Sequence, residues 1–167
     1  MIKKKFYTWH DIEKMCMQIV VKMYKDDFRP DYIVGITRGG NVPATIISNI
    51  TGIPCEALKV SLRDDGQGPE SNLWMSEDAY NGKNILIVDD INDTGATFNW
   101  IKKDWQASCM PSSDKWKEVW GNNVCFVTLT ENLASDFHEV NYSIDEINKA
   151  EEDVWLVYPW ENVSEFQ

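Results

Sequence analysis

The stretch that decides the fold is Lys83-Asn84-Ile85-Leu86-Ile87-Val88-Asp89-Asp90-Ile91-Asn92-Asp93-Thr94-Gly95-Ala96-Thr97. It opens with a short apolar run, mostly of β-branched residues, which is typical of a buried central strand. Two adjacent carboxylates, Asp89 and Asp90, follow at the carboxyl end of this strand, where open α/β sheets bind their ligands. The stretch therefore predicts an α/β sheet with a binding site at this edge.

The second half of the stretch predicts a tight turn that leads into a helix. Gly95 can adopt conformations that a Cβ would forbid, and the hydroxyls of Thr94 and Thr97 lie on either side of it. With the backbone N–H groups of the helix start, expected over about 96–106, these hydroxyls form a small anion cradle. Acids beside such a cradle suit a sugar phosphate with free hydroxyls. A plain strand ending in a solvated loop is the alternative, because Asp and Gly are ordinary turn residues.

A second glycine loop, Thr37-Arg38-Gly39-Gly40, follows a predicted strand at 32–36 and opens a helix that ends near Gly52. Tandem glycines let backbone N–H groups approach an anion, and the Arg38 guanidinium adds a fixed, forked donor. A structural turn is the alternative interpretation of this loop when it is taken alone. Two anion-binding loops, each after a core strand, favour a common site.

Composition bounds the classes of protein that remain. A chain of 167 residues is long enough for one domain with a buried core, so we expect residues 1–167 to form a single unit. No apolar run approaches the roughly 20 residues of a membrane helix, and no hydrophobic signal region follows the N-terminal lysines. The four dispersed cysteines contain no CxxC pair, which fits free thiols in the cytoplasm. A formal net charge of −11 argues against a nucleic-acid partner.

These motifs resemble those of type I phosphoribosyltransferases, which use 5-phosphoribosyl 1-pyrophosphate (PRPP). The segment 83–97 is similar to the PRPP-binding segment of that family, and the Arg38 loop is similar to its pyrophosphate loop. The resemblance implies an α/β fold with a twisted, mainly parallel sheet flanked by helices. It also implies a small hood from about 130–167 with the N-terminal segment, and a non-proline cis peptide before Arg38.

The resemblance also implies roles for individual residues. Asp89 and Asp90 bind the ribose hydroxyls and Mg²⁺, and Asp93 acts as the general acid/base facing the purine N7. Mg²⁺ is expected as the cofactor because PRPP is highly anionic and the chain is acidic. The residues that contact PRPP, according to this resemblance, are Arg38, Gly39, Gly40, Asp89, Asp90, Asp93, Thr94, Gly95, Ala96 and Thr97.

The stretch Asp153 to Glu161 resembles the end of xanthine-guanine and hypoxanthine phosphoribosyltransferases. Carried over, Trp155 stacks on the base, and Leu156 and Glu161 lie along its edge; for Trp160 a core position is favoured. One departure concerns the lysine that contacts the purine O6 in 6-oxopurine enzymes, because Asn132 falls about where that lysine is expected. An amide can donate or accept, so Asn132 could meet a 6-oxo or a 6-amino group.

Between the two loops, the chain from about residue 61 to 78 is polar and lacks periodicity. The family has a mobile catalytic loop at this position, so we expect a lid that includes Ser61 and Arg63, its only basic residue up to Met75. A tolerated surface loop is the alternative. The segment 108–123 looks like an insertion that covers the core or forms an interface, and family members commonly form homodimers or homotetramers.

The function expected is transfer of the phosphoribosyl group of PRPP to a purine base, with a 6-oxopurine favoured, giving a nucleoside 5′-monophosphate and pyrophosphate. One alternative is an enzyme for another base, such as adenine, uracil or a different heterocycle. A second is a non-catalytic regulator that senses PRPP. The acidic charge and the presence of Asp93, Arg38 and the lid argue against the regulator.

Overall fold

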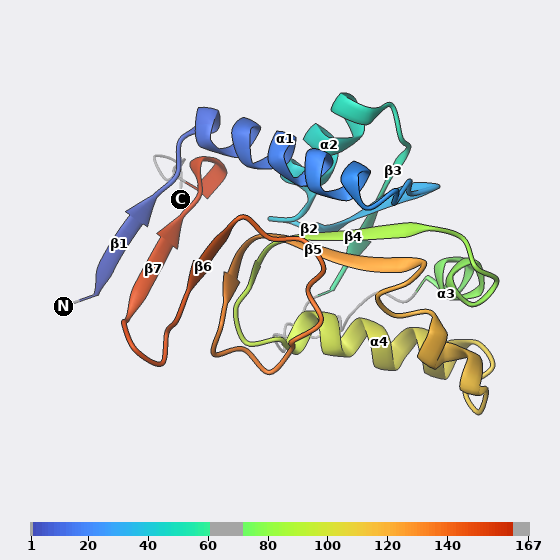
Figure 1. Ribbon diagram of the computed structural model, residues 1–167. Helices are drawn as coiled ribbons and strands as arrows, with labels where there is room; N and C mark the ends of the chain where they lie inside the picture. Colours follow the sequence, from blue (N-terminus) through green and yellow to red (C-terminus); the bar gives the residue numbers. More distant parts are fainter. Residues whose placement is uncertain (1, 61–71, 162–167) are drawn as a thin grey trace.

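The computed structural model describes residues 2–60 and 72–161, and it contains a five-stranded sheet in the order β3-β2-β4-β5-β6. All four neighbouring pairs of strands are parallel, so the predicted mainly parallel α/β sheet is confirmed. The stretch 83–97 forms the central strand β4 and the loop after it (Figure 1). The strands span Tyr32–Thr37 (β2), Cys55–Lys59 (β3), Ile85–Asn92 (β4), Val124–Asn132 (β5) and Asp145–Ile147 (β6).

Helices cover both faces of this sheet (Figure 1). On one face lie α1 (Trp9–Lys25) and α2 (Asn41–Thr51), and on the other lie α3 (Leu73–Tyr80) and α4 (Ala96–Ser108). The side chains of β4 alternate between the two cores: Leu86 and Val88 pack with α1 and α2, and Ile85 and Ile87 pack with α3 and α4. This burial on both faces explains why the strand is apolar without alternation.

A second, two-stranded sheet lies beside the first (Figure 1). It pairs β1 (Lys3–Phe6) with β7 (Val154–Val157) in parallel, so the N-terminal segment meets the end of the chain. The Tyr7 and Tyr158 rings stack just beyond these strands, with centroids 5.1 Å apart, and Trp160 stacks on Tyr158 at 4.8 Å. Trp160 packs against the core there, as the sequence favoured.

The segment 108–123 covers one of the two cores. Its short 3₁₀ helix η1 (Asp114–Glu118) buries Trp116, which stacks on Trp120 with centroids 5.5 Å apart. Trp120 in turn lies 6.0 Å from Phe126 on β5. The insertion therefore extends the apolar cover of the sheet on the α4 side, which was one of its two expected roles.

The polar segment expected to run as a lid over about 61–78 needs correction at its end. Leu73–Tyr80 is the helix α3, with Met75 and Ala79 buried in the core. These two residues are one helical turn apart, so they lie on the same face of the helix and pack it against the core. Residues 61–71 lie outside the described part of the chain. Within the described ranges, no helix is long and apolar enough to cross a lipid bilayer.

Candidate functional site at the carboxyl end of β4

The first predicted anion-binding loop, at Arg38, lies against the carboxyl end of β4, the strand that leads into the second loop. A Cβ built on Gly39 would lie 2.3 Å from Oδ2 of Asp90, and one built on Gly40 would lie 2.3 Å from the carbonyl oxygen of Val88. Only glycine allows the loop to approach the strand this closely. The peptide bond between Thr37 and Arg38 is cis, as the resemblance implied, and the Arg38 side chain is exposed. The Arg38 loop and the acidic strand therefore form one site.

The adjacent carboxylates of Asp89 and Asp90 are half-buried and close together. Burial, followed by the charge of Asp90, raises the pKa of Asp89 well above its usual range. Burial also raises the pKa of Asp90. Each carboxylate accepts one backbone N–H bond at 2.9 Å, Asp89 from the amide of Asp90 and Asp90 from the amide of Ile91. Two adjacent, partly buried carboxylates with raised pKa values are stabilised by hydroxyl donors or by a cation that offsets their charge.

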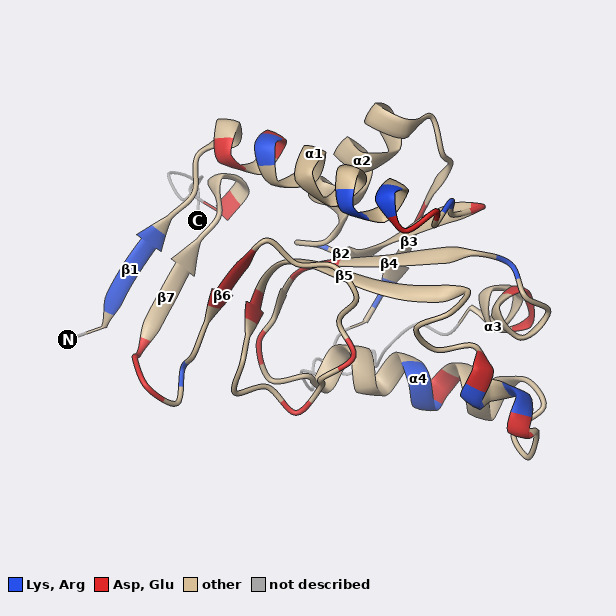
Figure 2. Cartoon of the chain, in the orientation of Figure 1, with Lys and Arg blue, Asp and Glu red and all other residues tan. Residues whose placement is uncertain are grey.

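The donor set fits a magnesium ion that is shared with a substrate. Two carboxylates are too few for an all-protein cage, and among residues 2–60 and 72–161 no three His, Cys, Asp or Glu side chains gather into a metal-binding group. Mg²⁺ is usually held by one or two carboxylates together with substrate phosphates and water. Figure 2 shows acidic residues along β6 and in the loops beyond β4 and β5, whereas β1 is basic.

The segment from Thr94 to Thr97 forms the predicted anion cradle at the start of α4. Gly95 has a φ of 89°, and a Cβ there would lie 2.5 Å from the backbone nitrogen of Phe137. The helix begins without a side-chain cap, so its first-turn N–H groups face the loop. The hydroxyl of Thr94 accepts a bond of 3.2 Å from the amide of Ala96. A hollow of ≈ 200 Å³ runs along residues 89–98 and joins the acids to the cradle.

Asp93 lies between this cradle and two other segments of the chain. Its Oδ1 is 2.9 Å from the Lys149 ammonium, which belongs to the turn after β6. The Asn132 amide nitrogen donates to the Asp93 carbonyl oxygen at 2.8 Å and to Oδ1 at 3.4 Å. The Asn132 amide oxygen accepts bonds from the backbone nitrogens of Ala134 and Lys149.

These contacts correct the expectation that Asn132 contacts the base. Its side chain is 5% exposed, and both ends of its amide already have partners in the protein. Asn132 instead holds the Asp93 loop and the Lys149 turn together. Sequence reasoning did not single out Lys149, because 56 residues separate it from Asp93 and no local motif marks it.

The base-stacking candidates lie on β7. Trp155 is 59% exposed, whereas Leu156 is buried in the core, as expected for successive residues of a strand. The Tyr158 hydroxyl donates to the backbone oxygen of Asp90 at 3.0 Å and shares a hydrogen bond of 3.1 Å with the Thr130 hydroxyl. Burial, and then the charge of Asp90, raises the pKa of Tyr158. Tyr158, which sequence reasoning missed, thus anchors the end of β7 to the acidic strand.

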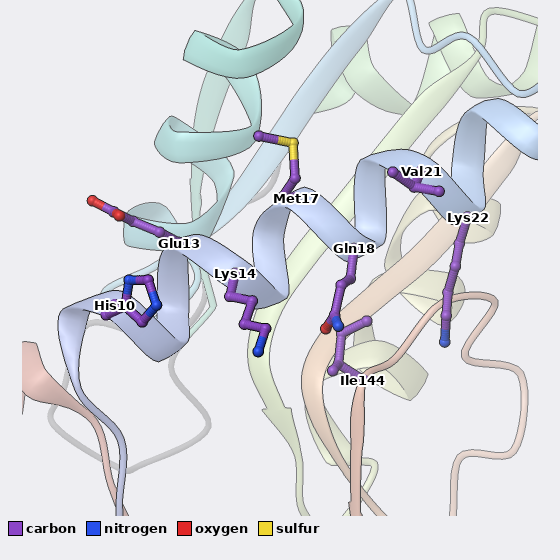
Figure 3. Close-up of a pocket in the computed structure, with 8 residues that line it drawn as sticks. All are labelled: His10, Glu13, Lys14, Met17, Gln18, Val21, Lys22 and Ile144. Carbon is purple, nitrogen blue, oxygen red and sulfur yellow. The ribbon is translucent and has the colours of Figure 1, made fainter.

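The lid candidates Ser61 and Arg63 lie outside the described residues. A larger hollow, of ≈ 780 Å³, lies elsewhere, along the outer face of α1. Figure 3 shows its lining side chains, which come from α1 and from Ile144, and none of them is a predicted site residue. The smaller, polar hollow is instead lined by predicted site residues, Asp89 to Thr97 among them.

Comparison with known proteins shows the family of the chain. A family model described as phosphoribosyl transferase domain matches residues 3–113. The chain is 29% identical to the hypoxanthine-guanine phosphoribosyltransferase of Schizosaccharomyces pombe, covering 93% of this chain and 88% of the relative. It is 23% identical to xanthine phosphoribosyltransferase 1 of Saccharomyces cerevisiae, covering 95% and 90%. A solved purine phosphoribosyltransferase from Pyrococcus horikoshii has the same fold, with a TM-score of 0.69, 22% identity and 98% of both chains covered.

Proposed function

The chain belongs to the phosphoribosyl transferase domain family, and on this premise we propose that it transfers the phosphoribosyl group of PRPP to a purine base. The products are a nucleoside 5′-monophosphate and pyrophosphate. The observation that carries the proposal is the contact of Gly39 with Asp90, because it joins a loop suited to pyrophosphate to acids suited to ribose hydroxyls. The relatives named hypoxanthine-guanine and xanthine phosphoribosyltransferase support a purine as the acceptor.

The PRPP-binding residues divide into three groups in this proposal. Arg38, Gly39 and Gly40 bind the pyrophosphate, and the exposed Arg38 guanidinium is well placed for this because it has no ion-pair partner among the described residues. The backbone amides and hydroxyls of residues 94–97 bind the 5′-phosphate. Asp89 and Asp90 bind the ribose hydroxyls, and their raised pKa values favour such hydrogen-bonded neighbours.

Magnesium is the proposed cofactor. Asp89 and Asp90 would hold it, and its charge would offset the leaving pyrophosphate. The protein's own contribution is positioning, since displacement at C1′ through an oxocarbenium-like transition state asks little covalent chemistry of the side chains. Asp93 is the proposed general acid/base, and it accepts a proton from the ring nitrogen of the base.

Trp155 is the proposed stacking partner of the base, and the backbone of Leu156 its edge contact. The exposed indole of Trp155 offers a flat apolar surface for a heterocycle. We also propose a homodimer or homotetramer in the cytoplasm. The exposed apolar side chains of Met17 and Val21 on α1 offer a surface for a second copy, and the four cysteines are free thiols.

The test measures pyrophosphate released from PRPP and magnesium, with guanine, hypoxanthine, xanthine, adenine and uracil offered separately. Turnover with a 6-oxopurine supports the proposal. Turnover with adenine alone would keep a purine as the acceptor but replace the favoured 6-oxopurine. Turnover with uracil alone would replace the purine assignment and keep the reaction class. Binding of PRPP without turnover of any base would overturn the enzymatic function and indicate a PRPP sensor. A Lys3→Met variant serves as a surface control, because Lys3 is 64% exposed on β1.

A further inference from the structure

Lys149 is a charged residue at the site that the proposed function does not use. Its ammonium lies 2.9 Å from Oδ1 of Asp93, and its side chain is 30% exposed, so it borders the site and is still accessible to a ligand. Its backbone nitrogen also donates to Asn132 at 3.0 Å. Asn132 in turn donates to Asp93, so three segments fix the position of this lysine.

The ion pair leaves hydrogen-bonding capacity on both of its partners. An ammonium carries three N–H donors, and the bond to Asp93 uses one of them. Oδ1 of Asp93 already receives bonds from Lys149 and Asn132, whereas Oδ2 accepts none from residues 2–60 and 72–161. The Asp93 side chain is 42% exposed. The pair therefore presents an acceptor directly beside a cationic donor.

Such a pair is complementary to a particular edge of a heterocycle. Asp93 can accept from a ring N–H, and Lys149 can donate to an oxygen on the neighbouring carbon. A 6-oxopurine has this edge, because its N7–H lies beside the C6 carbonyl. Adenine places an amino group at C6, and an ammonium has no lone pair to accept from it.

Resting on the proposed function, we propose that Lys149 is the specificity-determining residue for the acceptor base. It donates to the oxygen at C6 and so selects 6-oxopurines over 6-aminopurines. The two paired residues thus have different tasks. The carboxylate of Asp93 accepts the hydrogen bond from the ring N–H, and the ammonium of Lys149 donates to the oxygen on the neighbouring carbon. Asn132, at the end of β5, is buried and does not offer a donor to the base. Lys149, in the turn after β6, supplies that donor instead.

The experiment compares hypoxanthine with adenine, which differ in the group at C6, in Lys149→Met, Lys149→Gln, Lys149→Arg and wild-type protein. We expect Lys149→Met to lower kcat/KM for hypoxanthine about 10- to 100-fold, the usual effect of losing a charged hydrogen bond, while the KM for PRPP changes less than about twofold. Arginine should restore part of the loss. Lys3→Met is the matched control, because it also removes an ammonium that contacts a carboxylate, that of Glu152 at 3.4 Å.

Product binding gives a readout that does not depend on turnover. By calorimetry, Lys149→Met and Lys149→Gln should weaken binding of inosine 5′-monophosphate but not of adenosine 5′-monophosphate. Equal losses for both bases, or an unchanged preference for hypoxanthine, would overturn the inference and leave the proposed function intact. Wild-type protein that turns over adenine but not hypoxanthine would also overturn the inference and keep the proposed function. Wild-type protein that turns over no base would overturn both.

Discussion

Gly39→Ala tests whether the contact between the Arg38 loop and the acidic strand matters for PRPP. The added methyl group would lie 2.3 Å from Oδ2 of Asp90 and 2.6 Å from its Cγ. Since real Cβ contacts essentially never fall below 3.0 Å, the loop or the carboxylate must move by at least about 0.7 Å, the difference between these two distances. Gly39 is not among the glycines with a positive φ, so the contact itself, not backbone strain, is the perturbation.

The magnitude follows from where the displaced atoms lie. A misplacement of about 1 Å at a reacting centre can cost about 10²-fold in rate, which corresponds to about 2.7 kcal/mol of transition-state stabilisation. Rotation of Asp90 would also lose its 2.9 Å bond from the amide of Ile91, at about 1 kcal/mol of unfolding free energy. We therefore expect kcat/KM for PRPP to fall about 10²-fold and Tm to fall only by about 2–4 °C.

The assay is continuous pyrophosphate release at varied PRPP, with thermal unfolding followed in parallel. Gly52→Ala is the matched control: its φ of 77° makes alanine unfavourable by about 1 kcal/mol, but no atom lies within 4 Å of the added methyl group. It should lose similar stability and keep its kinetics. If the kcat/KM of Gly39→Ala for PRPP lies within about twofold of the Gly52→Ala value, the contact with Asp90 does not position the substrate.

Three further predictions concern the acid/base, the start of α4 and the buried thiols. Asp93→Asn should lower kcat by about 10² to 10⁴-fold while PRPP still binds in calorimetry; unchanged turnover would remove Asp93 from its role. Gly95→Ala should destabilise the protein more than Gly52→Ala in denaturant titration, because its methyl group also meets backbone at 2.5 Å; equal midpoints would contradict this. Burial raises the pKa of Cys16 to about 12 and of Cys125 to about 11, so neither forms much thiolate at pH 8. Both should react with a thiol reagent only after unfolding, and rapid modification in the native protein would contradict their burial.

The parts of the fold that sequence predicts well are those whose signal is local. The strand, turn and helix around Asp89 to Thr97 lie within one stretch, and each residue type has a direct structural reason there. The same holds for the glycine loop at Arg38, since strand, loop and helix follow one another without interruption. In both cases the chain order itself brings the functional groups to the carboxyl edge of the sheet.

The parts that sequence did not predict depend on distant partners. The strand β1 consists of Lys3–Phe6, and three lysines in succession show no strand pattern; its order comes from pairing with β7 at the other end of the chain. The strand β6 has only three residues, two of them acidic. The contact of Lys149 with Asp93 depends on the turn after this short strand, so its place in the site could be found only from the structure.

The distribution of charge explains how an acidic protein can hold an anionic substrate. The net charge of −11 repels PRPP at long range, but that repulsion is screened beyond about 8–10 Å in physiological salt. Inside that distance the positive groups of the proposed site are Arg38, the first-turn amides of α4 and the ammonium of Lys149, which offsets the charge of Asp93. The negative charge that remains, at Asp89 and Asp90, is what a divalent cation would offset. These two carboxylates would therefore repel PRPP alone, but they would favour PRPP that binds together with Mg²⁺.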